Sequence, residues 1–171
     1  GRPVQLTRLN DELFAGKTLG RVEPLAVRAP DGREVPSWLV LPPGWQPGRR
    51  VPLILEIHGG PHTSYGESFA TDMQLYAAAG YAVLYTNPRG STSYGEEFAN
   101  LIDKRYPGPD YDDLIAAVDA AVGKGVADPD NLFVTGGSGG GVLTAWIIGK
   151  TDRFKAAAVQ KPVINWTSQT L

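Results

Sequence analysis

The 171-residue chain contains no cysteine, which excludes disulfide bonds, thiolate metal sites and a cysteine nucleophile together. It also lacks a basic surplus, since 16 Lys and Arg stand against 18 Asp and Glu for a net charge of −2. We therefore expect neither nucleic acid nor an anionic membrane as a partner. No apolar run approaches the about 18 residues that span a bilayer, and residues 1–13 lack the layout of a signal peptide. These absences favour a soluble protein, cytoplasmic or periplasmic, without choosing between the two compartments.

Short apolar runs alternate with helical segments along most of the chain. The runs without polar alternation, typical of strands covered on both faces, are 52–57, 81–86, 132–135 and 156–159. The segments with helical character between them are 69–79, 111–122 and 142–150. This alternation predicts a doubly wound, mostly parallel α/β sheet.

An antiparallel hairpin is predicted before the first parallel strand, with arms at 22–29 and 34–41 around Asp31-Gly32. Such a hairpin entering a parallel sheet is a further indication of a hydrolase-type fold. Residues 1–20 are polar with little periodicity and are interpreted as a linker or edge segment. We therefore expect one partial α/β-hydrolase domain over residues 21–171.

The most informative motif is Gly-x-Ser-x-Gly at Gly136, Ser138 and Gly140, directly after a predicted strand and before a predicted helix. That context is typical of a nucleophile elbow, in which a strained turn exposes the serine hydroxyl at the positive end of a helix. A dinucleotide-binding loop does not fit, because Val142 stands where the third glycine is required. A phosphate loop lacks its Gly-Lys-Ser/Thr. A purely structural glycine turn stays open as an alternative.

The sequence HGGPH at residues 58–62 follows the predicted strand 52–57 and holds both histidines of the chain. A His-Gly-Gly loop at this place is where hydrolase folds gather a second oxyanion donor, alongside the N–H that follows the nucleophile. In this fold the catalytic acid and histidine come after the serine along the chain. We therefore expect an oxyanion or structural role for His58 and His62 rather than that of general base.

Neither a catalytic acid nor a base is evident after Ser138. Asp152 is the one acid downstream, and it is expected to cap a helix or to pair with Arg153. A complete hydrolase sheet takes about 200–250 residues as one domain. The expectation is a domain truncated before completion, whose acid and base lie outside this chain.

Several motifs together resemble the catalytic domain of the prolyl oligopeptidase family of serine peptidases, and within it the acylaminoacyl-peptidase and dipeptidyl-peptidase-like branch. In chain order they are PLILEIHGGPH, GYAVLYTNPRGSTSYGEEF, DYDDLIAAVDAAV, DPDNLFVTGGSGGG and TDRFKAAAVQKPVINW. The resemblance implies a gating β-propeller before the domain, with residues 3–13 as the tail leaving it. It also implies a charge-relay Asp and His beyond residue 171.

The resemblance assigns roles to individual residues. It implies that Ser138 is the nucleophile, that the Gly139 N–H is an oxyanion donor, and that His58, beside Gly59, occupies the place where family members present a second, side-chain oxyanion donor. It also implies that Arg89 is structural, paired with an acid such as Asp113. The positions matching the pocket for the substrate residue before the scissile bond are Val163 and Trp166, for which burial in the core is the alternative. Family members carry a bulky aromatic residue where this chain has Gly139, and its absence is expected to enlarge or loosen the site.

The predicted function is hydrolysis of peptide or acylated-amino-acid bonds through an acyl-enzyme on Ser138, with no metal or organic cofactor. An esterase on the same fold is an alternative. A non-catalytic fragment or pseudo-hydrolase module is another. In either enzyme reading the C-terminal remainder of the domain donates the Asp and His, as part of the same protein or as a separate chain. An uncovered strand at 156–159 would demand pairing, so a homo-oligomer is also considered.

Overall fold

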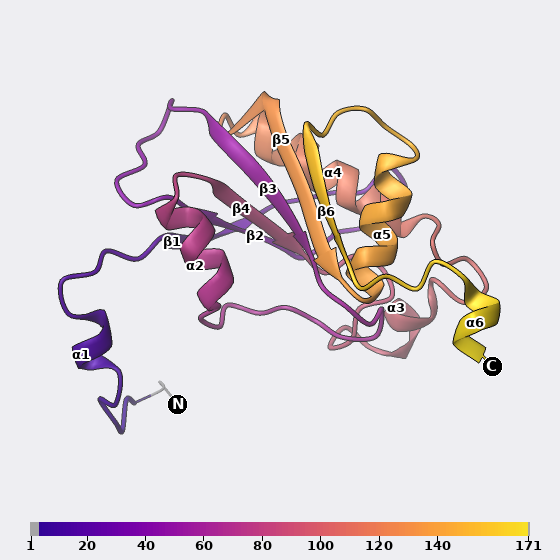
Figure 1. Cartoon of the computed structure of the whole chain (residues 1–171), viewed down its shortest axis with the longest axis horizontal. Helices are drawn as coiled ribbons and strands as arrows, with labels where there is room; N and C mark the ends of the chain where they lie inside the picture. Colours follow the sequence, from indigo (N-terminus) through magenta and orange to yellow (C-terminus); the bar gives the residue numbers. More distant parts are fainter. Residues whose placement is uncertain (1–3, 171) are drawn as a thin grey trace.

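The computed structural model describes residues 4–170. The start of the predicted linker (residues 1–3) and the last residue of the predicted domain (171) lie outside the described residues. Six strands form one sheet in the order β1-β2-β4-β3-β5-β6 (Figure 1). The pairs β1–β2 and β2–β4 are antiparallel, and the pairs β4–β3, β3–β5 and β5–β6 are parallel. The predicted mostly parallel sheet with an N-terminal hairpin is confirmed.

The hairpin consists of β1 (Arg21–Leu25) and β2 (Ser37–Leu41), paired from Arg21 opposite Leu41 to Leu25 opposite Ser37. Its regular ladder is shorter than the predicted arms 22–29 and 34–41, and beyond it only an isolated bridge joins Arg28 to Glu34. Pro36 explains the interruption, because it has no N–H to donate to a ladder. Its carbonyl instead accepts bonds from the Thr86 hydroxyl and the Asn87 N–H, at 3.0 and 2.8 Å, which tie the hairpin to the end of β4.

The four apolar runs predicted as buried strands all form strands. They are β3 (Val51–Ile57), β4 (Ala82–Thr86), β5 (Ala127–Gly137) and β6 (Ala156–Gln160). Within β3, alternate side chains from Val51 to Ile57 are fully buried. Because β3 lies between β4 and β5, its carboxyl end stands next to the carboxyl end of β5, where the serine motif begins.

The three predicted helices are α2 (Thr71–Ala78), α4 (Asp110–Gly123) and α5 (Gly139–Ile148). Three shorter ones are α1 (Asp11–Phe14), in the segment predicted as a linker, α3 (Glu96–Asn100) and α6 (Trp166–Thr170). The start of α5 was predicted too late, at residue 142. The first turn is made of glycines because the helix end abuts strand ends: a Cβ on Gly140 would lie 2.1 Å from the Ile57 carbonyl oxygen.

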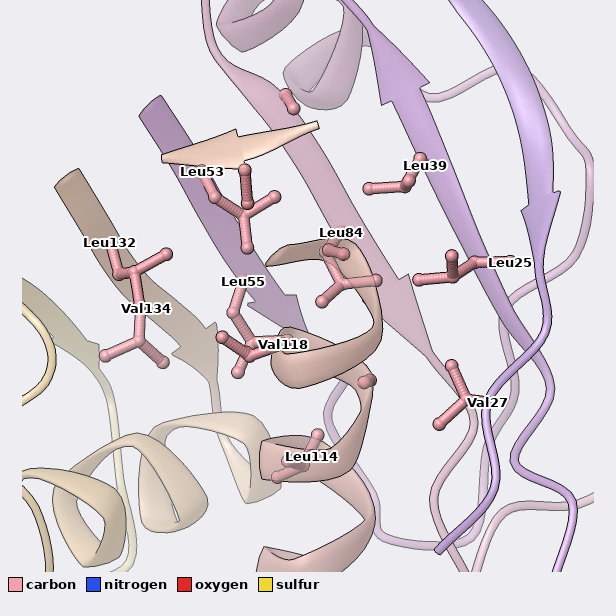
Figure 2. Close-up of a cluster of buried hydrophobic side chains, with 14 of the residues drawn as sticks. Leu25, Val27, Leu39, Leu53, Leu55, Leu84, Leu114, Val118, Leu132 and Val134 are labelled. Atoms are coloured by element: carbon pink, nitrogen blue, oxygen red, sulfur yellow. The ribbon is translucent and has the colours of Figure 1, made fainter. Parts of the chain in front are cut away.

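The larger hydrophobic core lies between one face of the sheet and the helices α4 and α5. In Figure 2, Leu55 of β3 and Leu84 of β4 point toward Leu114 and Val118 of α4. The opposite face carries a smaller cluster, in which Tyr85 and its neighbours pack on Met73 and Ala77 of α2. Together these layers hold the strand ends, and therefore the serine motif, in a fixed frame.

The strand order ends at β6 (Figure 1). Ala156, Ala157 and Ala158 of that strand are exposed. A hollow of about 280 Å³ is lined by these alanines together with Tyr81 and Phe133. The structure therefore presents the bare, apolar sheet edge that the sequence predicted. Within residues 4–170, no helix is both long and apolar enough to cross a membrane.

Candidate active site

Ser138 occupies the sharp turn between β5 and α5, with φ 57° and ψ −117°. These are strained values for a residue with a side chain, and such strain concentrates at functional sites. Two hydrogen bonds hold the turn: the Ser138 N–H donates to Gln160 of β6 at 3.1 Å, and the Val142 N–H donates to the Ser138 carbonyl at 3.0 Å. The side chain makes no hydrogen bond to any residue from 4 to 170, so its hydroxyl remains available. The geometry is that of a nucleophile elbow.

The loop that follows β3 lies directly against this turn. A Cβ built on Gly59 would be 3.5 Å from Ser138 Cβ and 4.0 Å from its Oγ. Gly60, the next residue of this loop, lies against the start of α5. A Cβ on Gly139 would lie 3.1 Å from the Gly60 nitrogen. Sequence reasoning did not single out Gly60. Gly60 has a φ of +110°, a backbone conformation that favours glycine. The Gly-Gly pair before a proline could have suggested such a conformation from the sequence.

Three backbone N–H groups at this junction are uncommitted. Those of Gly59, Gly60 and Gly139 donate to no acceptor within the described part of the chain. The first N–H groups of a helix have no intrahelical partner, so Gly139 is free for that reason as well. N–H groups beside a nucleophile and at a helix N-terminus can stabilise the oxyanion of an acyl-transfer reaction.

The ring of His58 is buried and both of its nitrogens have partners. Nδ1 lies 2.6 Å from the Gly59 carbonyl oxygen and Nε2 lies 2.9 Å from the Ser91 hydroxyl. Because a carbonyl only accepts, Nδ1 carries the proton of a neutral ring. The single hydroxyl proton of Ser91 is shared between two acceptors, Nε2 and the Pro88 carbonyl oxygen, which lies 2.7 Å from the Ser91 oxygen. Burial lowers the pKa of His58 and favours that neutral form. The ring thus braces the loop and has no free N–H to offer the oxyanion.

His62 is turned to a different part of the structure, with Nδ1 3.0 Å from the Gly90 carbonyl oxygen. Neither histidine bonds to Ser138 within the described residues, and the expectation that neither is its general base stays a prediction. Nor do three His, Asp or Glu side chains gather anywhere in residues 4–170 in a way that could hold a metal ion.

The segment after β4 supports the loop of His58 through a buried ion pair. Arg89 donates to Asp113 of α4 from its backbone N–H, Nε and Nη2, at 2.8, 2.9 and 2.6 Å. Asp113 is completely buried and Arg89 is 8% exposed. The predicted structural pair is confirmed, and it anchors the turn that carries Ser91.

Asp152 behaves differently from its prediction. Arg153 pairs with Asp119 of α4 at 2.6 Å, and Asp152 is exposed and forms no ion pair among the residues described. The prediction considered neighbours in sequence, whereas the fold brings α4 alongside the segment that follows α5.

The absent side chain at position 139 does not leave a void beside the helix start. A Cβ there would lie 2.6 Å from the Gly60 carbonyl oxygen, so backbone occupies that place and the expected enlargement is wrong at this point. The Gly139 carbonyl is held as well, because it accepts a 2.8 Å bond from the Tyr106 hydroxyl. The loops that carry Gly60 and Tyr106 thus clamp Gly139 from two sides.

Trp166 of α6 is half exposed and lines a hollow of about 540 Å³ together with Tyr106, Pro61 and His62. Its ring centroid lies 6.3 Å from that of Tyr106. Val163 is partly buried and does not line this hollow. Of the two predicted pocket residues, the structure therefore places Trp166 on a cavity wall near Gly139.

A second hollow, of about 390 Å³, contains Ser138 itself. Its lining includes His58, Gly59, Glu56 of β3 and Lys161, the residue that follows β6. Burial, together with the negative charge of Asp72, raises the pKa of Glu56 to about 7. Neither Glu56 nor Lys161 was identified from the sequence, because nothing in the pattern around them differs from an ordinary strand and loop.

Comparison with known proteins agrees with this site. Residues 67–171 match the model of the prolyl oligopeptidase family. An uncharacterized peptidase of Bacillus subtilis, YuxL, is 47% identical over 96% of this chain and 25% of its own length. The acylamino-acid-releasing enzyme of Arabidopsis thaliana is 42% identical over 71% of this chain and 16% of its own length.

The structure of the Pyrococcus horikoshii acylaminoacyl peptidase superposes with a TM-score of 0.88 at 31% identity, covering 96% of this chain and 27% of that one. The fold is that of an α/β-hydrolase. The chain spans about a quarter of the length of the proteins with which it aligns almost end to end. The nucleophile elbow and the neighbouring loop are consistent with these similarities. The chain belongs to the prolyl oligopeptidase family.

Proposed function

We propose that this chain supplies the nucleophile and the oxyanion site of a serine peptidase. Ser138 attacks the carbonyl carbon of the substrate as its proton passes to a base, and the amine leaves with a proton from that base. Water then hydrolyses the acyl-enzyme and regenerates Ser138. The observation that carries the proposal is the strained Ser138 turn, whose unbonded hydroxyl lies beside the free N–H groups of Gly59 and Gly139.

The oxyanion donors in this proposal are backbone groups. The N–H of Gly139 and an N–H of the Gly59–Gly60 loop point their partial positive charge at the developing negative charge, each worth about 2.7–4 kcal/mol in comparable sites. His58 acts through the loop, since both of its ring nitrogens are already bonded. The wall at Trp166, with Val163 nearby in sequence, receives the substrate residue before the scissile bond.

The substrate class follows from the relatives. Proteins named as acylamino-acid-releasing enzymes and a dipeptidyl aminopeptidase are among them, which supports peptides or N-acylated amino acids as substrates. The acid and the base come from a segment outside residues 1–171, either the remainder of the same protein or a second chain, which joins the sheet at β6. Residues 21–171 are then the nucleophile-bearing part of the catalytic domain.

Labelling by a fluorophosphonate probe tests the proposal. The full-length protein is expected to react, its Ser138→Ala variant is expected not to react, and residues 1–171 alone are expected to react slowly or not at all because no base reaches Ser138. A folded full-length protein that does not react would contradict the peptidase and esterase readings together. Reaction without cleavage of peptide substrates, but with cleavage of esters, would favour the esterase.

A further inference from the structure

Glu56 places a carboxylate in the wall of the hollow that contains Ser138. It is the second-last residue of β3 and stands level with Tyr85 of β4 and Thr135 of β5. Its side chain lies on the sheet face that carries the smaller core cluster, and it is partly buried. Glu56 is thus a partly buried acidic residue on the strand next to the one that leads into Ser138.

The carboxylate has no partner within residues 4–170: it accepts no side-chain hydrogen bond and forms no ion pair. Its titratable and charged neighbours come from the loop after β3, from α2, from β4 and from the residue after β6. They are His58, Tyr65, Asp72, Tyr76, Tyr85 and Lys161. Burying a charged group without a donor is costly, so this arrangement favours a positively charged group or a strong donor as the missing neighbour.

Ser138, in the same hollow, has no general base within residues 4–170. A base that takes the Ser138 proton must stand about 2.6–3.2 Å from Oγ, and both histidines of this chain are bonded elsewhere. The hollow of about 390 Å³ beside Ser138 has room for an imidazole carried by another segment. An imidazole seated there shares the hollow with Glu56.

We propose that Glu56 is a positioning residue for the catalytic base, holding a negative charge near the imidazole that receives the Ser138 proton. This inference rests on the proposed function. When the proton leaves Ser138, the imidazole becomes an imidazolium, and a nearby carboxylate stabilises that charged form relative to the neutral one. The pKa of the base is therefore higher with Glu56 present than without it. The carboxylate also restricts the orientations that the imidazolium can adopt.

The test is the pH dependence of fluorophosphonate labelling in the full-length protein, between pH 5 and 9. The labelling rate follows the neutral fraction of the base, so it rises through the pKa of the base. In Glu56→Gln the midpoint of this rise is expected about half a unit or more lower, because the stabilising charge is gone. In Glu56→Asp, which keeps the charge with a shorter reach, the midpoint is expected to lie between the two. The matched control Glu97→Gln, on the exposed face of α3, is expected to leave it unchanged.

Glutamine keeps the size and shape of the glutamate side chain and has no charge to bury, so the variant is expected to fold with a melting temperature no lower than that of the wild type. A labelling profile of Glu56→Gln that coincides with that of the wild type would overturn the inference while leaving the proposed function intact. So would an effect confined to the KM of substrates with a free amino group, which would assign Glu56 to substrate recognition. If the wild type is not labelled, the proposed function fails and the inference falls with it.

Discussion

Replacing Gly139 by alanine probes the contact between the nucleophile turn and the loop after β3. An alanine Cβ would stand 2.6 Å from the Gly60 oxygen and 2.9 Å from its carbonyl carbon, whereas ordinary van der Waals contact begins near 3.4 Å. The backbone of one segment must therefore move by about 0.8 Å, the difference between 3.4 and 2.6 Å. A side chain cannot yield in its place, since both neighbours are backbone atoms.

The cost of that movement falls on both stability and reactivity. Overpacking of this kind destabilises a fold by about 1–3 kcal/mol. The displaced groups include the N–H donors of Gly139 and Gly60, and a misplacement of about 1 Å in a catalytic arrangement lowers rates about 100-fold. We expect Gly139→Ala to reduce fluorophosphonate labelling of Ser138 in the full-length protein by between about 10-fold and 100-fold.

The control is Gly123→Ala, at the end of α4, where a Cβ would meet nothing within 4 Å. Alanine favours helices over glycine by up to about 1 kcal/mol, so this variant is expected to label normally and to melt at the same temperature or slightly higher. The reasoning would be refuted if Gly139→Ala labelled at the wild-type rate and kept its melting temperature. The close approach of Gly60 would then impose no constraint on position 139.

Two further predictions concern buried charges, both measured in the full-length protein. Asp113→Ala removes the acceptor of three Arg89 bonds and leaves the largely buried guanidinium paired with the more exposed carboxylate of Asp31, 3.0 Å away. The free energy of unfolding in urea is therefore expected to fall by about 3 kcal/mol, the lower end of the range for breaking a buried pair. Asp119→Ala, in an exposed pair with Arg153, is expected to change it by no more than about 0.5 kcal/mol, and equal losses would contradict this account. Burial raises the pKa of Asp110 to about 6, so the folded state holds a proton that the unfolded state releases near pH 3.8. Stability contributed by this group is complete below about pH 4 and is lost as the pH rises through about 6. Asp110→Asn is expected to flatten that decline in melting temperatures measured from pH 4 to 7, and an unchanged slope would count against it.

Local patterns in the sequence determined the elements and the position of the nucleophile. The four apolar runs predicted strands because a strand covered on both faces needs apolar side chains at successive positions. The glycines around Ser138 predicted a tight strand-to-helix turn for a steric reason that needs no tertiary information. The pairing of Arg89 with Asp113 was anticipated as well, but from the family resemblance rather than from a local pattern.

Contacts between distant segments could not be read in the same way. The clamp on Gly139 joins residues 60, 106 and 139, and the brace on His58 joins residues 58 and 91. The Asp119 partner of Arg153 was missed because it lies on α4, while the prediction considered the adjacent Asp152. Each of these contacts depends on which strand ends and helices become neighbours in the fold. Local sequence patterns do not determine those neighbours.

The sequence by itself therefore determined that the chain has a serine on a strained turn in an α/β sheet, because strand, turn and helix signals are local. Only the tertiary structure decided what surrounds that serine. The order β4-β3-β5 sets the carboxyl ends of β3 and β5 side by side, which brings the loop N–H groups and Glu56 to Ser138. The same order leaves β6 at the edge with its alanines exposed. Chemistry at the site follows from this juxtaposition, since oxyanion donors and charges act only through their positions in space.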